Sequence, residues 1–256
     1  MRMRVLLTND DGIHSPGLRA LAEAFGAAHE TVVVAPEGQR SATGHAITLH
    51  KPLRARSSAA YPAGVTAWAT NGTPADCVVL GVRELLPYLP DIVVSGVNVG
   101  PNLGLDLTYS GTVSGAMEGA ILGIPSVAIS VASFVDVSFD VAAAFAERLA
   151  RLVLDRRLPA DALINVNVPN LPVDYLKGVV ITRQSSRRYL SRVERRTDPR
   201  GQSYYWLTGE AETMADDAGT DGWAVAGGYI SVTPIHLNMT DDRLLRELGT
   251  WGLSVR

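Results

Sequence analysis

Five residues near the N-terminus place two adjacent carboxylates among polar neighbours: Thr8-Asn9-Asp10-Asp11-Gly12. Adjacent carboxylates repel each other, and a cation bound between them removes that repulsion. A hard divalent ion such as Mg²⁺ prefers oxygen ligands of this kind. Most acidic turns are simply exposed to solvent. The pair therefore predicts a metal site only where the fold places it in a cleft and brings further oxygen ligands to it.

The acidic pair lies where a buried strand should give way to a helix. Val5-Leu6-Leu7 is apolar, and Ser15-Pro16-Gly17 supplies a hydroxyl cap and a proline for a first helical turn. Ligands of open α/β sheets bind at such strand ends. A dinucleotide site would need G-x-G-x-x-G in this turn. Apolar residues then repeat along one face of the expected helix at Leu18, Leu21, Ala22 and Phe25.

Two further polar loops follow expected strands and should meet the first loop at the same edge of the sheet. The loop after residues 31–35 offers the Ser41 hydroxyl to a metal and the Arg40 charge to an anion. The loop after 91–95 carries Asn98 and Asn102, whose amides can bind a cation or a phosphate. Each of these residues could equally have only a structural role in its own loop, without binding a ligand. No zinc spacing involves His45 or His50, which we interpret as structural or exposed.

A fourth polar segment begins a helix at Ser110-Gly111-Thr112, where hydroxyls and free N–H groups at a positive dipole end favour an anion. We expect substrate phosphate contacts from this segment together with Asn9 and Asn102. The spacing in 111–115 does not match the G-x-S-x-G turn of serine hydrolases. Together the three loops predict a cation site next to an anion site, with Asp10 as the candidate that orients an attacking water.

The remaining pattern predicts alternating strands and helices. Residues 46–53 and 65–70 look like a hairpin, 73–76 like a capping box before a buried helix through Leu86, and 162–168 like the last core strand. Beyond about residue 183, a basic block (183–200), Tyr204-Tyr205-Trp206 and an acidic block (210–221) predict a protruding antiparallel arm. A strand near 227–234 and a closing helix around Leu244 follow. Alternating charge and aromatic blocks suit a subunit interface.

Composition restricts the function classes. The chain has 256 residues, is 46% hydrophobic and 19% charged, and carries a net charge of −3. These values are ordinary for a soluble α/β protein, and they favour neither a specific nucleic-acid partner nor a membrane surface. The single cysteine, Cys77, excludes an internal disulfide and suits a reducing compartment. With no membrane-length apolar run, we expect a cytoplasmic protein.

Several motifs in order resemble the SurE family of survival-protein phosphatases, over nearly the whole chain. They are Thr8-Asn9-Asp10-Asp11-Gly12, Arg40-Ser41-Ala42, Asn71-Gly72-Thr73-Pro74-Ala75-Asp76, Ser95-Gly96-Val97-Asn98-Val99-Gly100-Pro101-Asn102, Tyr109-Ser110-Gly111-Thr112-Val113 and Ser231-Val232-Thr233-Pro234-Ile235. The resemblance implies a single SurE-like domain over 1–256. Its α/β core would be a Rossmann-like, doubly wound, mostly parallel sheet over about 1–183, followed by an oligomerisation arm and C-terminal segment over about 184–256.

The same resemblance implies a metal-dependent phosphomonoesterase acting on nucleoside 5′- and 3′-monophosphates, and possible shortening of polyphosphate. It assigns one divalent ion per subunit, Mg²⁺ or Mn²⁺ with Ca²⁺ also able to bind in a crystal, to Asp10, Asp11, Ser41 and Asn98. Asp10 and Asp11 would be the catalytic residues. It further implies a homodimer or homotetramer formed through the C-terminal region.

Two other functions stay open from the residues alone. Phosphatases that form an aspartyl-phosphate also place acids after the first strand, but they need a D-x-D pair, and here the acids are adjacent. A trapped phosphoenzyme would favour this class. A nucleotide-binding stress protein without catalytic activity is the second alternative. Absence of metal-dependent phosphate release from every nucleotide would favour that class.

Overall fold

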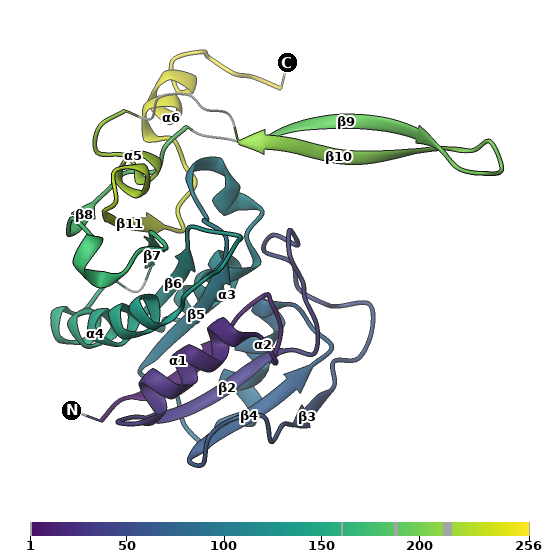
Figure 1. Cartoon of the computed structure of the whole chain (residues 1–256). Coiled ribbons are helices and arrows are strands. Elements are labelled where there is room, and N and C mark those ends of the chain that lie inside the picture. The colour runs from purple at the N-terminus through teal and green to yellow at the C-terminus, as the bar shows by residue number, and fades with distance from the viewer. Residues whose placement is uncertain (1, 160, 187–188, 212–216, 256) are drawn as a thin grey trace.

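A nine-stranded sheet forms the centre of the computed structural model, which describes residues 2–159, 161–186, 189–211 and 217–255 (Figure 1). The strand order is β3-β4-β2-β1-β5-β6-β7-β11-β8. All neighbours are parallel except β3 with β4 and β11 with β7. The bounds are Arg4–Thr8 (β1), Glu30–Pro36 (β2), Ala55–Ser57 (β3), Val65–Thr70 (β4), Ile92–Val99 (β5), Ser126–Val131 (β6), Ala162–Val168 (β7), Val179–Ile181 (β8) and Ile230–His236 (β11). The predicted α/β, mostly parallel class is confirmed.

Helices cover both faces of the sheet, as a doubly wound fold requires. Helices α1 and α4 pack on one face, and α2 and α3 pack on the other. The bounds are Pro16–Gly26 (α1), Pro74–Leu80 (α2), Gly111–Ile121 (α3), Asp140–Arg156 (α4), Asp221–Ala226 (α5) and Asp242–Leu248 (α6), with short turns at Gly81–Leu85 (η1), Gly104–Thr108 (η2) and Val173–Tyr175 (η3).

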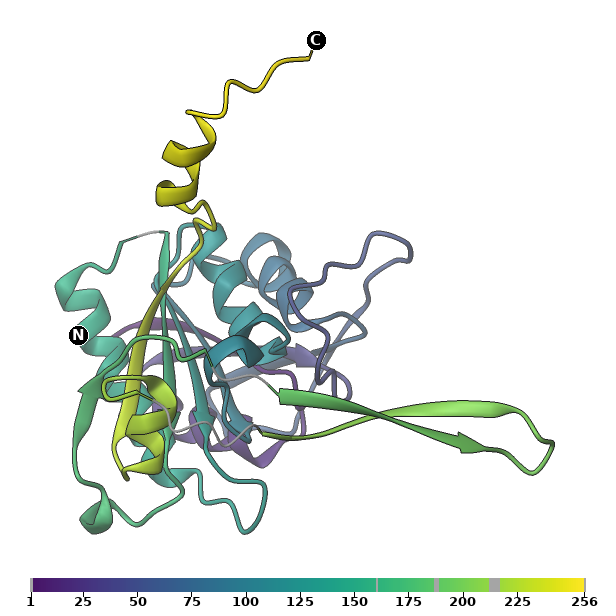
Figure 2. The ribbon, with the colours of Figure 1, turned by 90° about the horizontal axis from the view of Figure 1, so that it is seen from above.

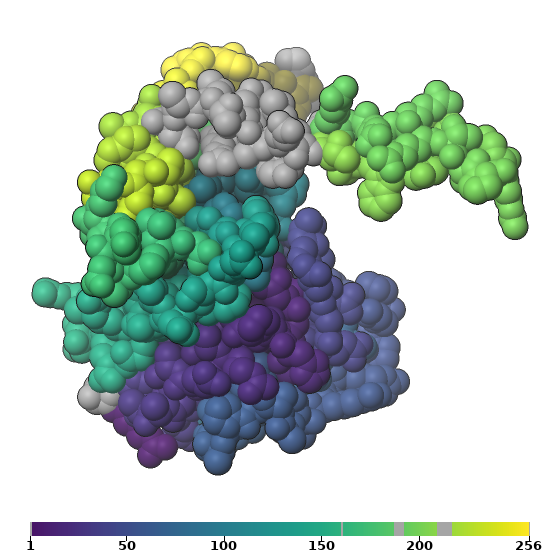
Figure 3. All heavy atoms as spheres, in the orientation of Figure 1, coloured from purple at the N-terminus to yellow at the C-terminus, as the bar shows by residue number. Residues whose placement is uncertain are grey.

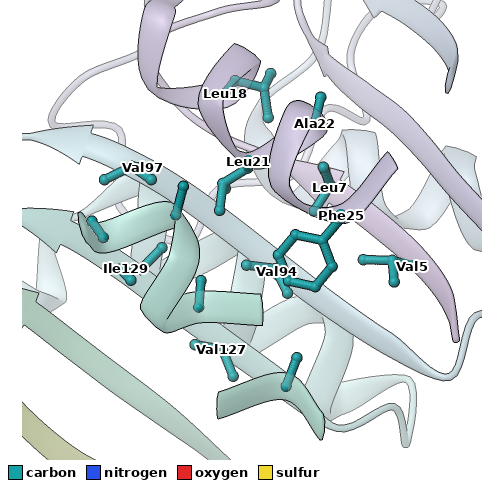
Figure 4. Close-up of a cluster of buried hydrophobic side chains, with 14 of the residues drawn as sticks. Val5, Leu7, Leu18, Leu21, Ala22, Phe25, Val94, Val97, Val127 and Ile129 are labelled. Carbon is teal, nitrogen blue, oxygen red and sulfur yellow. The ribbon is translucent and has the colours of Figure 1, made fainter. Parts of the chain in front are cut away.

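Alternation along the strands supplies both apolar layers. Val5 and Leu7 of β1 belong to the cluster under α1 and α4, whereas Leu6 between them belongs to the cluster under α2. Figure 4 shows Leu21 and Phe25 of α1 packed over the sheet, in the same cluster as Val5 and Leu7. Strands buried on both faces are typical of parallel sheets and explain the unbroken apolar runs in the sequence.

The carboxyl ends of β1, β2 and β5 bring three loops together, as the sequence predicted. The Ile13 N–H donates to the Pro36 carbonyl at 2.8 Å, and the Arg40 N–H donates to the Asp10 carbonyl at 2.7 Å. These two bonds join the loop after β1 to the loop after β2. The predicted cap is also present, because the Ser15 hydroxyl accepts the Leu18 N–H at the start of α1.

Three sequence predictions about strands are wrong. Residues 46–53 form no strand; β3 starts at Ala55 instead, although it pairs antiparallel with β4 as the predicted hairpin did. Strand β5 continues through Val99, with a register shift between Ser95 and Asn98, where a loop was expected. Strand β7 is not the last core strand, since β11 and β8 extend the sheet beyond it. The glycines at 96 and 100 led to the expectation of a loop where β5 continues. The long stretch of sequence between β7 and β11 hid the fact that these two strands pair.

The predicted antiparallel arm is confirmed as a two-stranded hairpin of β9 (Tyr189–Thr197) and β10 (Ser203–Ala211). Figure 3 shows the hairpin standing clear of the body. Residues 187–188 of the basic block and 212–216 of the acidic block lie outside the described residues.

The predicted closing helix corresponds to α6, but this helix does not close the core. None of its residues is buried, and Figure 2 shows it projecting with the C-terminal segment away from the body. None of the helices in the described ranges combines the length and apolar character needed to cross a membrane.

Candidate active site

A cavity of about 600 Å³ opens where the three loops meet. Its wall includes all four residues predicted as metal ligands, Asp10, Asp11, Ser41 and Asn98. These residues come from the ends of β1 and β5 and from the loop after β2. A second hollow of about 470 Å³ shares Asp11 with the first and continues past His14 and Glu37. The acidic pair is therefore placed in a cleft rather than on a solvent-facing turn.

Asp10 is held by the first turn of α3. The Thr112 hydroxyl donates to Asp10 Oδ1 at 2.5 Å. A Cβ added to Gly111 would lie 2.6 Å from Asp10 Cβ, so the close approach requires glycine. Burial raises the pKa of Asp10 above its usual value, while hydrogen bonds from Thr112 and from backbone groups including that of Gly111 act in the opposite direction. The positive end of α3 thus faces a protein carboxylate.

Asp11 is less well compensated than Asp10. Its Oδ2 accepts a long bond of 3.4 Å from the Val99 N–H. Burial and the charge of Asp10 raise the pKa of Asp11 to about 6. Within the part of the chain that the structure describes, no Lys, Arg or His side chain pairs with either carboxylate. The electrostatics of the pair therefore favour a bound cation.

The two neutral side chains predicted as ligands offer oxygen atoms that suit the same cation. Asn98 donates its Nδ2 to the Gly100 carbonyl at 2.7 Å, which leaves the Oδ1 as the atom able to bind a metal. The Ser41 hydroxyl oxygen accepts from Gln39 Nε2 at 2.9 Å and lines the cavity. No group of three His, Cys, Asp or Glu side chains able to hold a metal occurs among the described residues. Two carboxylates with neutral oxygens are a donor set for Mg²⁺ or Mn²⁺ rather than for zinc.

The five predicted substrate residues divide into two groups. Asn102 and Ser110 line the cavity, although the Ser110 hydroxyl also caps α3 by accepting the Val113 N–H at 3.0 Å. Asn9, Gly111 and Thr112 lie behind the wall. Asn9 is buried and bonds to Gly12 and Ser15, which shapes the turn of the acidic pair. Their contacts favour a role in holding the carboxylates.

Asn102 belongs to a buried amide network that sequence reasoning missed. Its Nδ2 donates to Ser130 Oγ at 2.8 Å, and its carbonyl accepts from Asn165 and Asn167, each at 2.9 Å. Asn167 also accepts the Asn102 N–H at 2.8 Å. The network fixes the turn after β5 onto β6 and β7. Two asparagines in the apolar stretch 162–168 were the available signal.

The loop that carries Ser41 is fastened to α3. The Gly44 N–H donates to the Tyr109 carbonyl at 3.0 Å. His45 Nε2 lies 2.8 Å from Glu118 Oε2, and Glu118 is mostly buried on α3. The structural interpretation of His45 fits this contact. Glu118 was not singled out from the sequence, since one acid in a small-residue helix gives no pattern.

The C-terminal region fastens another loop of the cavity. Asp221 is fully buried; its Oδ2 accepts the Gly104 N–H at 2.9 Å, and its Oδ1 accepts the Ser185 N–H at 3.0 Å. Gln184 donates to the Gly104 carbonyl at 2.7 Å. The loop so anchored, η2, contains Asp106, which lines the cavity. Residues from beyond β8 thus support the cavity although they are distant in sequence.

Comparisons with known proteins agree with these features. The family model described as survival protein SurE matches residues 5–191. A 5′-nucleotidase SurE from Geobacter metallireducens is 52% identical over 253 residues, covering 98% of each chain. Another, from Heliobacterium modesticaldum, is 49% identical over 249 residues, covering 97% of this chain and 92% of the relative.

A solved structure is also similar. The crystal structure of the SurE protein from Aquifex aeolicus has a TM-score of 0.83 at 45% identity, and the match covers 95% of this chain and 97% of that chain. Fold, sequence and motif order therefore agree over almost the full length. The chain belongs to the SurE family of survival proteins.

Proposed function

We propose that this chain is a metal-dependent nucleotidase that hydrolyses nucleoside 5′-monophosphates to nucleoside and phosphate. The observation that carries the proposal is the convergence of Asp10, Asp11, Ser41 and Asn98 on one cavity. Its volume of about 600 Å³ lies within the range of small-molecule sites. Relatives about half identical in sequence bear the name 5′-nucleotidase. Nucleoside 3′-monophosphates and polyphosphate ends are further proposed substrates, on the family resemblance.

The cofactor in this proposal is one divalent ion, Mg²⁺ or Mn²⁺. Asp10, Asp11, Ser41 and Asn98 would hold it through oxygen atoms, which fits the donor set described above. When bound, such an ion polarises a phosphoryl oxygen and lowers the pKa of water. The carboxylate of Asp11, which lies beside Asp10 without a cationic partner among the described residues, supplies the electrostatic reason for the ion to bind.

The protein's own groups contribute position and charge. Thr112 and Gly111 hold Asp10 at the cavity wall, where its carboxylate orients a water molecule toward the phosphorus. The N-terminus of α3 points its positive end at Asp10 and, with the hydrogen bonds from Thr112 and Gly111, favours the ionised form of that carboxylate. Because these contacts are already formed in the folded protein, the carboxylate needs no rearrangement during the reaction.

We also propose that the protein forms a homo-oligomer through its C-terminal region. In the monomer, Tyr205 and Trp206 on β10 are 59% and 55% exposed, and Leu253 after α6 is 77% exposed. Soluble monomers seldom carry such extended apolar segments uncovered. A second copy placed about a two-fold axis covers them.

We propose a cytoplasmic location as well, and the buried free thiol of Cys77 suits it.

The direct test measures phosphate release from a panel of nucleoside monophosphates with and without a chelator. We expect no release after exhaustive chelation and recovery with added Mn²⁺ or Mg²⁺. The variant Asp11→Asn removes a charged ligand without changing shape, and we expect a loss of about 10²-fold or more. Asp174→Asn makes the same chemical change at an exposed position of η3 and should leave activity unchanged.

Three results would contradict the proposal. Full activity of the chelated protein would exclude the metal. Near-normal turnover of Asp11→Asn at ordinary metal concentrations would exclude this site. A covalent phosphoenzyme after a denaturing quench would replace direct hydrolysis by the aspartyl-phosphate route.

A further inference from the structure

Two largely exposed aromatic side chains, Phe134 and Tyr109, line the cavity of the predicted metal ligands, and Phe134 is the more exposed of the two. Phe134, in the loop after β6, is 73% exposed and lines the same cavity as Asp11 and Asn98. An exposed phenyl ring leaves a large apolar area in water, which is unfavourable unless something covers it. The position of this ring at the cavity wall indicates a ligand as its cover.

The ring of Phe134 lies directly on Gly100, the residue that follows the end of β5 and Asn98. A Cβ added to Gly100 would lie 2.1 Å from Phe134 Cε1 and 2.5 Å from Cζ. Gly100 also has a φ of 94°, which other residues rarely adopt. The carbonyl of the same glycine accepts the Asn98 side chain at 2.7 Å. The predicted metal ligand and the phenyl ring therefore share one glycine as their common support.

The loop that presents Phe134 is anchored at both ends. The Ser133 hydroxyl donates to the Val135 carbonyl at 2.8 Å and accepts the Val135 N–H at 3.2 Å. Asn170 after β7 donates to the Asp136 carbonyl and accepts the Ser138 N–H, each at 3.0 Å. The backbone around the ring is thus held in place while the ring itself stays uncovered, as a preorganised binding surface should be.

We infer that Phe134 is the platform on which the purine or pyrimidine base of the substrate stacks, while its phosphate lies at Asp10, Asp11 and Asn98. This assignment rests on the proposed nucleotidase function and adds the second half of its substrate site. Apolar atoms of Pro101 and Leu207 line the same cavity. Because every base has a π-face, stacking on a phenyl ring discriminates little between bases. The platform therefore predicts a nucleotidase with broad base tolerance.

The neighbouring hollow is a poorer site for a base. It also borders Asp11, but the charged Glu37 and the small residues Gly12 and Gly38 line it, and the one aromatic ring among its described lining residues is the imidazole of His14. A base placed there would find less apolar surface to cover than in the first cavity. Stacking and desolvation both favour the side of the metal ligands where Phe134 lies.

The test compares a substrate that has a base with one that lacks it. We measure kcat/KM for AMP and for ribose 5-phosphate, and the inhibition constant of adenosine. The wild-type protein should prefer AMP by about tenfold, the scale of base–aromatic stacking. Phe134→Ala should remove this preference by raising the KM for AMP, and it should raise the inhibition constant of adenosine about tenfold. The kcat/KM for ribose 5-phosphate should stay the same. Phe134→Tyr keeps a ring and should retain the preference.

The matched control is Val135→Ala, the next residue, which is 70% exposed but does not line the cavity. It should leave both substrates and the adenosine inhibition unchanged. The inference is overturned if wild type shows no preference for AMP, if Phe134→Ala weakens both substrates equally, or if it changes only the sedimentation of the protein. Failure of the proposed function would look different, since wild type would then release no phosphate from either compound.

Discussion

The variant Gly111→Ala tests whether the contact between α3 and Asp10 sets the geometry of the site. The added Cβ would lie 2.6 Å from Asp10 Cβ and 2.8 Å from Asp10 Oδ2. Ordinary van der Waals contact begins at 3.4 Å. The helix and the carboxylate must therefore move apart by about 0.8 Å, because the nearest atom, Asp10 Cβ, is attached directly to the backbone and cannot swing away as a side-chain end could.

The expected cost falls on activity more than on stability. A displacement near 1 Å of a positioned group lowers a rate by about 10²-fold, which corresponds to about 2.7 kcal/mol. Overpacking destabilises by roughly 1–3 kcal/mol. Alanine favours a helix over glycine by about 1 kcal/mol, which offsets part of that amount. We therefore expect a folded protein with about a hundredth of the wild-type kcat/KM.

The assay measures kcat/KM for AMP at saturating Mn²⁺, with thermal unfolding followed by circular dichroism. Gly38→Ala serves as the control, because a Cβ there meets no atom within 4 Å although Gly38 belongs to the loop that carries Ser41. It should keep full activity. If Gly111→Ala stays within threefold of wild type while its melting temperature is unchanged, the idea that this contact positions Asp10 is wrong.

Three further predictions address the ligands, the arm and the N-terminal strand. Asn98→Ala should reduce phosphate release severely and Ser41→Ala mildly, since water can replace a neutral hydroxyl; equal effects in a steady-state assay would contradict the ligand ranking. The double variant Tyr205→Ala with Trp206→Ala should shift sedimentation toward smaller species, and a wild type that sediments as a monomer at micromolar concentration would refute the oligomer. Asp91→Asn should lower the free energy of unfolding at pH 7 only modestly, because Asp91 accepts a charged hydrogen bond from Arg4 at 2.5 Å but solvent screens this exposed pair. That hydrogen bond with Arg4 holds the pKa of Asp91 below its ordinary value, so the stabilisation is present above the ordinary pKa and disappears as pH falls through the lowered one. Denaturant unfolding of both proteins between pH 7 and pH 2 would check this, and a gap that widens in acid would contradict it.

Local sequence signals predicted the elements that are continuous in the chain. The Ser15 cap, the apolar face of α1 and the apolar runs of β1, β6 and β7 depend on neighbouring residues only. The meeting of Asp10, Ser41 and Asn98 followed from a general rule, since carboxyl ends of parallel strands share an edge. That much of the cavity could be placed before the structure was known.

The missed features depend on contacts between distant residues. Nothing near Asp221 in the sequence indicates that its carboxylate binds Gly104, and nothing near Phe134 indicates a cavity. Thr112 was expected to face a phosphate, because a helix N-terminus attracts any anion; the structure fills that place with Asp10. Sequence reasoning identified the kind of charge at this helix end but could not tell which carboxylate or phosphate would be there.

The antiparallel strand β11 has a consequence for how this protein forms during synthesis. A chain growing on the ribosome acquires β1, β5, β6 and β7 early, but β7 lacks its outer neighbour until residues 230–236 have been added. The anchor of Gly104 likewise waits for Asp221. Nascent chains halted after β8 should therefore remain sensitive to protease at the 104–108 turn, and resistance there should appear only when the strand after Asp221 has emerged from the exit tunnel.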